Sequence, residues 1–145
     1  MKINPDCIRD VLLYLEENLK IEDDSFSSIS LHTLQKNLTQ YSKEDVFYSV
    51  YNLKEIRFIE GIFRGADNSE MYVCHINNIT YAGHQFLNTV RPQSVWDKTK
   101  TIAGKVGVHT LGFLESVAHD VAVELAKQFV NNLSNPTGIP KTTLV

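Results

Sequence analysis

The spacing of apolar residues changes from a helical period to a strand period near residue 57. Before that point, apolar residues recur at intervals of three and four, as they do in amphipathic helices. After it, residues 58–64 and 71–76 alternate and are rich in β-branched and aromatic side chains, which predicts two strands. Residues 65–70 between them are polar turn formers. We therefore expect three helices followed by a β-hairpin.

The three helices have recognisable start signals. Asn4-Pro5-Asp6 begins the first, of about residues 5–20, because Asn caps, Pro fits the first helical position and Asp suits the positive end of the helix dipole. Ser30 can cap a short second helix, and a short extended piece, 26–29, precedes it. Ser42 with Asp45 is close to a capping box and opens a third helix that ends near Ile56.

Helix, strand, helix, helix, hairpin is the element order of a winged helix-turn-helix domain. The segment Ile79-Thr80-Tyr81-Ala82-Gly83-His84-Gln85-Phe86-Leu87 supports the same prediction. It places a Thr cap directly after a strand and opens another helix. It resembles the segment that follows the wing in many bacterial winged-helix regulators.

The C-terminal third is predicted to be helical. A short helix of about 94–102 is anchored by Trp96, and Gly104-Lys105-Val106-Gly107 ends it. A final helix of about 110–133 carries a wide apolar stripe, which needs a surface to cover it. It either packs back on the winged domain or pairs with its copy in a homodimer, and we expect the homodimer. The interface residues would be Leu114, Val117, Val121, Leu125 and Phe129.

The predicted fold class is mainly α with a small β-hairpin (α+β). Residues 1–91 form the winged-helix domain, residues 92–134 a helical extension for oligomerisation, and residues 135–145 a disordered tail rich in turn formers.

Three segments together resemble a known family: Asn4-Pro5-Asp6-Cys7-Ile8-Arg9-Asp10-Val11-Leu12, Tyr41-Ser42-Lys43-Glu44-Asp45-Val46, and residues 79–87 quoted above. The chain is similar, to about residue 130, to an uncharacterised domain-of-unknown-function family of Gram-positive bacteria and their phages and prophages. The resemblance implies a prophage-type accessory protein and brings no established activity and no site residues.

Charge argues against a strongly basic binding surface. Residues 1–80 hold eight Lys/Arg against thirteen Asp/Glu, whereas residues 81–145 hold six against four. No segment approaches the roughly 18 uninterrupted apolar residues of a membrane span. The first apolar cluster, residues 11–15, is short and is flanked by charged residues, so it does not fit a secretory signal. We therefore expect a cytoplasmic protein without a membrane partner.

The residues do not predict an enzyme, a metal site or a cofactor. Cys7 and Cys74 belong to no ligand spacing and are expected as buried free thiols. Strand alternation places Cys74 and His75 on opposite faces of the sheet, so the two side chains cannot bind the same metal ion. Cys7 lies in the first turn of a helix but has no recognisable base nearby.

Double-stranded DNA is the first candidate partner. In a helix-turn-helix, the recognition helix reads bases, while cations and hydroxyls hold phosphates. The residues placed to do this are Ser42, Lys43, Tyr48, Asn52, Lys54, Arg57 and Arg64. Acids accompany them on the third helix and wing (Glu44, Asp45, Glu60, Asp67 and Glu70), and few neutralised phosphates mean weak binding. Residues 91–105, with a net charge of +3, form either a phosphate-contacting strip or a solvated helix face.

A protein partner, from the host or a phage, is the competing candidate. Fold alone does not decide function, and an acidic face with Tyr48 and Tyr51 exposed suits a protein interface. The sequence thus predicts a phage- or prophage-type winged-helix accessory protein that is DNA-binding or transcription-regulatory. The alternative is a protein-protein interaction adaptor or inhibitor that has lost DNA binding.

Overall fold

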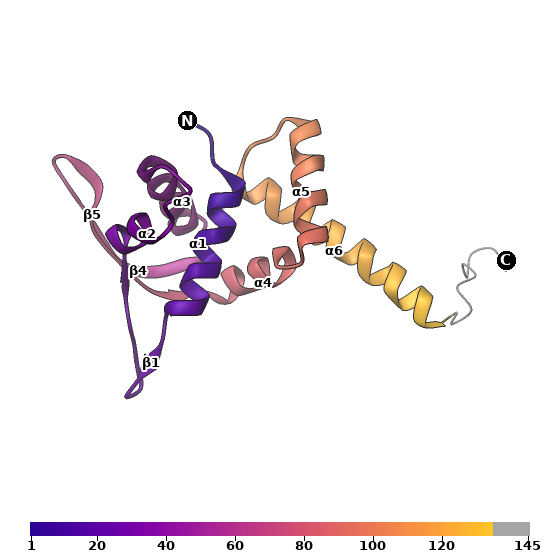
Figure 1. Cartoon of the computed structure of the whole chain (residues 1–145), viewed down its shortest axis with the longest axis horizontal. Helices are drawn as coiled ribbons and strands as arrows, with labels where there is room; N and C mark the ends of the chain where they lie inside the picture. Colours follow the sequence, from indigo (N-terminus) through magenta and orange to yellow (C-terminus); the bar gives the residue numbers. More distant parts are fainter. Residues whose placement is uncertain (135–145) are drawn as a thin grey trace.

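The computed structural model describes residues 1–134, which form six helices and two small antiparallel sheets (Figure 1). The fold is mainly α with a small β component, as predicted. Its first half contains α1 (Pro5–Asn18), α2 (Leu31–Asn37) and α3 (Lys43–Glu55). The predicted caps are confirmed: the side chains of Asn4, Ser30 and Ser42 accept hydrogen bonds from backbone N–H groups of the first turns of these helices.

The larger sheet has the strand order β3-β5-β4, all antiparallel, from β3 (Ile29–Ser30), β4 (Ile59–Ala66) and β5 (Ser69–Ile79). The predicted hairpin is present, but its strands are longer than expected. Ala66 pairs with Ser69, so the connection is the two residues Asp67-Asn68 and not the predicted loop of 65–70. In Figure 1 this hairpin extends beside α2 and α3.

A second hairpin was not predicted. β1 (Ile21–Glu22) pairs with β2 (Ser25–Phe26) through a two-residue turn, Asp23-Asp24, in which both residues have positive φ (48° and 60°). Two successive positive φ values are the requirement of the tight hairpin turns, and Asp tolerates them better than most residues. The arm projects away from the helices (Figure 1).

Helix α4 (Tyr81–Val90) follows β5 directly, and Thr80 caps it as predicted. The Thr80 hydroxyl accepts from the Gly83 N–H and donates to the Arg57 carbonyl (2.7 Å), which joins the start of α4 to the end of α3. Gly83 is required for packing, because a Cβ there would lie 2.2 Å from the Phe58 carbonyl oxygen. The Thr-x-x-Gly pattern therefore fixes how closely α4 approaches the chain after α3.

Helices α5 (Gln93–Val106) and α6 (Leu111–Ser134) complete the described chain. Helix α5 is longer than the predicted 94–102: it passes through Gly104, continues to Val106 and stops at Gly107, whose φ of 80° is left-handed. Glycine adopts this conformation without strain, which is why it ends helices. The predicted tail, 135–145, lies outside the described residues.

The main core extends across the predicted domain boundary at residue 91. Trp96, Leu111 and Ala118 belong to the same cluster of buried residues as the inner faces of α1, α3, α4 and the sheet. A second, smaller cluster joins Val95 of α5 to Val117 and Val121 of α6. The first half of α6 thus packs on the body, and the second half projects beyond it (Figure 1). No helix within residues 1–134 is long and apolar enough to cross a membrane.

Candidate interaction surface

The outer face of α3 borders a groove of about 670 Å³. The inner residues of α3, among them Val46, Val50 and Leu53, are buried in the core, which turns the opposite side of the helix to the outside. The groove lies between this side, α2 and the β4–β5 hairpin. It is lined by Met1, Gln35, Lys43, Glu44, Phe47, Tyr48, Tyr51 and Glu70.

Aromatic side chains form the apolar part of the groove. The rings of Tyr48 and Tyr51 are stacked, with centroids 6.4 Å apart and planes 10° from parallel. The ammonium of Lys54 lies 5.2 Å from the Tyr51 ring centroid and 5.8 Å from that of Phe63, within cation–π range. Phe47 lies between exposed and buried. These half-exposed rings give the groove a preformed apolar surface.

Besides Tyr48, whose ring stacks on Tyr51, three of the seven residues predicted to bind DNA make polar contacts through their side chains. The Ser42 hydroxyl caps α3 by accepting from the Asp45 N–H (3.0 Å). The Asn52 amide donates to the Tyr48 carbonyl of its own helix (2.7 Å). Lys54 forms an ion pair with Glu55 (3.3 Å) in addition to its aromatic contacts.

The other predicted cations are exposed but separated. Lys43 is in the first turn of α3, and Arg64 is on β4. Arg57 follows the end of α3 with a left-handed φ of 63°, and its carbonyl is held by Thr80. The whole segment 42–70 contains four Lys/Arg and six Asp/Glu. The segment that contains all seven residues predicted to bind DNA is therefore net acidic.

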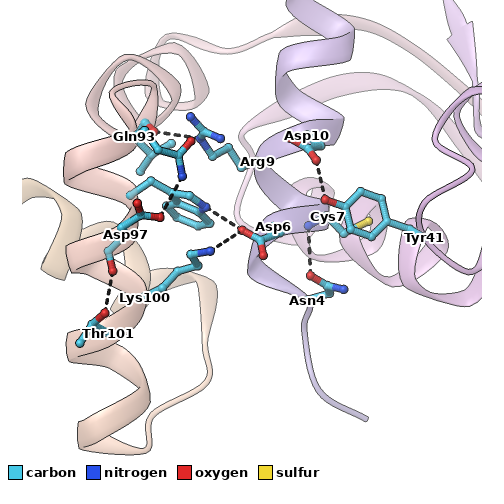
Figure 2. Close-up of polar contacts among 12 residues, drawn as sticks. Asn4, Asp6, Cys7, Arg9, Asp10, Tyr41, Gln93, Asp97, Lys100 and Thr101 are labelled. Atoms are coloured by element: carbon cyan, nitrogen blue, oxygen red, sulfur yellow. Dashed lines mark hydrogen bonds and ion pairs between the residues drawn. The ribbon is translucent and has the colours of Figure 1, made fainter.

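Two cations of the basic segment 91–105 form ion pairs with α1, which neither prediction for this segment, a phosphate-contacting strip or a solvated helix face, included. Arg91 donates two hydrogen bonds to Glu16 of α1 (2.8 and 2.6 Å). Lys100 donates to Asp6 (2.9 Å), which also accepts from the Trp96 indole (2.8 Å) (Figure 2). Two of the four cations of this segment thus join α1 to the helices that follow. Lys98 and Lys105 are exposed.

Both cysteines are free and buried, as predicted. Burial raises the pKa of the Cys7 thiol to about 11, and burial raises that of Cys74 to about 11 as well. A thiol with such a pKa is protonated at neutral pH and is a poor nucleophile. Cys74 is buried and His75 exposed, as strand alternation requires. Within residues 1–134, no group of three or more His, Cys, Asp and Glu is placed to hold a metal ion.

The predicted interface on α6 needs a correction. Leu114, Val117 and Val121 are buried against the chain's own helices, so they are not available to a partner. Leu125 is partly buried beside the smaller cluster, and Phe129 is exposed. An interface on α6 therefore has to lie further toward its C-terminal end.

Two surfaces were missed from the sequence. Met1 and Gln35 line the α3 groove, but only the tertiary structure brings them beside α3. The β1–β2 arm exposes the cross-strand pair Ile21 and Phe26 next to its acidic turn. The Asp23-Asp24 pair between short apolar segments was the available signal for this arm.

A family model described as "Hypothetical protein (DUF2513)" matches residues 2–109. The chain belongs to this family. An uncharacterised protein of Haemophilus influenzae (strain ATCC 51907 / DSM 11121 / KW20 / Rd) is 32% identical over 101 residues, which is 70% of this chain and 77% of that protein. No solved structure matches. The DUF2513 match spans α1 to α5 and ends just before α6. The predicted uncharacterised family is thus confirmed, and its Gram-positive or phage origin stays a prediction.

Proposed function

We propose that this chain is a non-enzymatic winged-helix scaffold whose α3 face binds a segment of a protein partner. The topology supports the winged-helix part. A short strand, β3, lies between α1 and α2 and pairs with the second strand of the hairpin, giving the order β3-β5-β4. This is the arrangement in which α3 takes the place of the recognition helix and β4–β5 that of the wing.

The groove beside α3 is the observation that carries the proposal. It is large enough for several side chains of a ligand, and its aromatic residues Phe47, Tyr48 and Tyr51 lie where a DNA reader would need cations. Aromatic residues are enriched in protein interfaces, whereas DNA affinity depends on the number of phosphates that Lys and Arg neutralise. With Lys54 paired and six acids nearby, this face suits a protein better than DNA.

The rim of the groove indicates the chemistry of the partner. Among the side chains that line the groove, two are acidic, Glu44 and Glu70, and one is basic, Lys43. A partner segment with a large apolar anchor for the rings and Lys or Arg next to it would satisfy both the apolar floor and the acidic rim. The free buried thiols suit the reducing cytoplasm.

Selection of peptides from a random display library on the immobilised full chain tests the proposal. We expect enriched peptides that combine an aromatic or aliphatic anchor with flanking Lys or Arg. Their affinity should fall at least about tenfold in Tyr48→Asp and stay unchanged in Tyr81→Asp, which alters an exposed tyrosine at the start of α4. Equal affinity in both variants, or no enriched peptide, would refute a groove-based function.

Charge reversal provides a second, independent variant pair. Glu70 lines the groove, while Glu60 is another exposed acid of the same hairpin that does not line it. Glu70→Lys should weaken the selected basic peptides, and Glu60→Lys should leave them bound. An identical response to the two changes would mean that only the overall charge matters.

DNA binding is the second candidate, because Lys43, Arg57 and Arg64 are exposed on the elements that face DNA in winged helices. The double variant Lys43→Glu with Arg57→Glu separates the two functions. If DNA is the partner, this change abolishes retention on duplex DNA. If the groove binds a protein segment, the basic peptides anchored at Tyr48 bind at least as tightly, because Lys43 lines the groove and Lys43→Glu makes its rim more acidic.

A further inference from the structure

The C-terminal half of α6 carries an apolar face that the described chain leaves uncovered. Along the first half, the side chains of Leu114, Val117 and Val121 are buried on the body. Beyond Val121 the helix continues for thirteen residues to Ser134 and projects from the body (Figure 1). On this projecting half, Phe129 is 64% exposed, Val130 57% and Leu133 66%.

These exposed residues form one continuous face. At 100° per residue, the apolar positions of the projecting half fall within about half of the helix circumference. They are Ala122, Val123, Leu125, Ala126, Phe129, Val130 and Leu133. Glu124, Lys127, Gln128 and Asn131 lie on the remaining side. The apolar face therefore contains no charged residue.

Six of the seven apolar residues of this face match one another when the helix is reversed, and the seventh, Val123, lies at the edge of the face opposite Asn132. In two antiparallel copies that cross between positions 127 and 128, Ala122 lies opposite Leu133, Leu125 opposite Val130, and Ala126 opposite Phe129. Every apolar residue of these pairs meets an apolar residue, and each alanine meets a large side chain. Alternation of small and large residues is how facing helices interdigitate.

Charge and geometry favour the same arrangement. The projecting half contains one acid, Glu124, and one base, Lys127, so two copies do not repel each other. Antiparallel helices also oppose their dipoles favourably. Because α6 projects from one side of the body, antiparallel pairing keeps the two bodies at opposite ends of the contact.

We propose that the projecting half of α6, residues 122–133, binds the same segment of a second copy of this chain as an antiparallel helix pair. The inference is independent of the α3 groove. The contact is short, because twelve residues of helix span only about 18 Å. The dimer is accordingly concentration-dependent, and isolated helices of this length are marginal in water without a cover.

Sedimentation velocity of the full chain over about 1–500 µM tests the pairing. We expect the average mass to rise from that of a monomer toward that of a dimer. Phe129→Asp and Leu133→Asp should each shift the midpoint at least about tenfold to higher concentration. Gln128→Asp, an equally acidic change on the polar side of the same helix, should not shift it. A monomer at every concentration, or dimers unaffected by Phe129→Asp and Leu133→Asp, would overturn the proposal.

Disulfide trapping tests the direction. A mixture of Ala122→Cys and Leu133→Cys chains should cross-link between the two kinds of chain, faster than either variant alone. Faster cross-linking of each variant with itself would show parallel helices and contradict the antiparallel pair. The unmodified chain, whose two native thiols are buried, is treated in the same way, and its cross-linking is subtracted as the background.

Discussion

The indole nitrogen of Trp96 donates a 2.8 Å hydrogen bond to Asp6, ninety positions earlier in the chain. The same carboxylate accepts from Lys100, so one acid in the first turn of α1 holds two residues of α5 (Figure 2). Arg9 adds bonds to the carbonyls of Val90 and Arg91. These contacts make α5 part of the body and position the first half of α6 against it.

Removal of the Asp6 carboxylate should destabilise the fold. In Asp6→Ala, the buried Trp96 N–H loses its partner, and hydrogen bonds to charged groups contribute about 1.5–3 kcal/mol. We expect the free energy of unfolding in urea to fall by that amount. Asp97→Ala is the control, because this exposed carboxylate accepts only from the Gln93 side chain one turn earlier on α5. Equal losses in the two variants would show that the link between α1 and α5 adds no stability.

The same carboxylate should make stability depend on pH. Burial acts to raise the pKa of Asp6, but the hydrogen bonds from Lys100 and Trp96 and the nearby positive charges outweigh it and lower the pKa. A carboxyl group whose pKa is lower in the folded than in the unfolded chain stabilises the fold at pH values above the unfolded pKa of 3.8. This stabilisation is lost as the pH falls through the pKa of the folded state. The difference in unfolding free energy between the wild type and Asp6→Asn should therefore shrink on acidification from pH 6 to below pH 4. A difference that is constant with pH would contradict the lowered pKa.

Two glycines should respond oppositely to the same substitution. Gly83→Ala places a Cβ against the Phe58 carbonyl and should cost about 1–3 kcal/mol or more. Gly104 is inside α5 with open space around it, so Gly104→Ala should stabilise by about 0.5–1 kcal/mol. Thermal unfolding of the two variants gives the comparison. Gly83→Ala with an unchanged melting temperature would mean that α4 does not pack this closely.

The two thiols should be inert in the folded protein. With both buried and their pKa values raised to about 11, Cys7 and Cys74 should react with a thiol reagent at pH 8 much more slowly than a free thiol. In denaturant both should react fully. Rapid native labelling of Cys7 would reopen it as a candidate nucleophile.

Local signals predicted the helices of this fold well. Asn4, Ser30, Ser42 and Thr80 each have a capping oxygen at the right distance from a helix start, and each caps in the structure. The β1–β2 arm was missed because each of its strands has only two residues, too few to show a strand period. Asp23-Asp24 fits a tight turn, and the pairing of Ile21 with Phe26 completes the hairpin.

The candidate surfaces were harder to predict because they depend on contacts between distant residues. Arg91 and Lys100 were interpreted as surface cations, since their partners Glu16 and Asp6 lie 75 and 94 positions away. The stripe on α6 was predicted, but its burial on α5 and α4 follows from the tertiary structure. Periodicity identifies an apolar face and does not say what covers it.

Retention of the full chain on random duplex DNA across a salt series tests the central claim most directly. Non-specific attraction to phosphates is strongest at low salt, so about 50 mM salt gives a DNA-binding surface its best chance. Because the α3 face is acidic and aromatic, we expect no retention on DNA at 50 mM salt, while peptides selected on the groove still bind. Retention at 50 mM salt that disappears in Lys43→Glu with Arg57→Glu would contradict this claim and show α3 to be a DNA-binding helix.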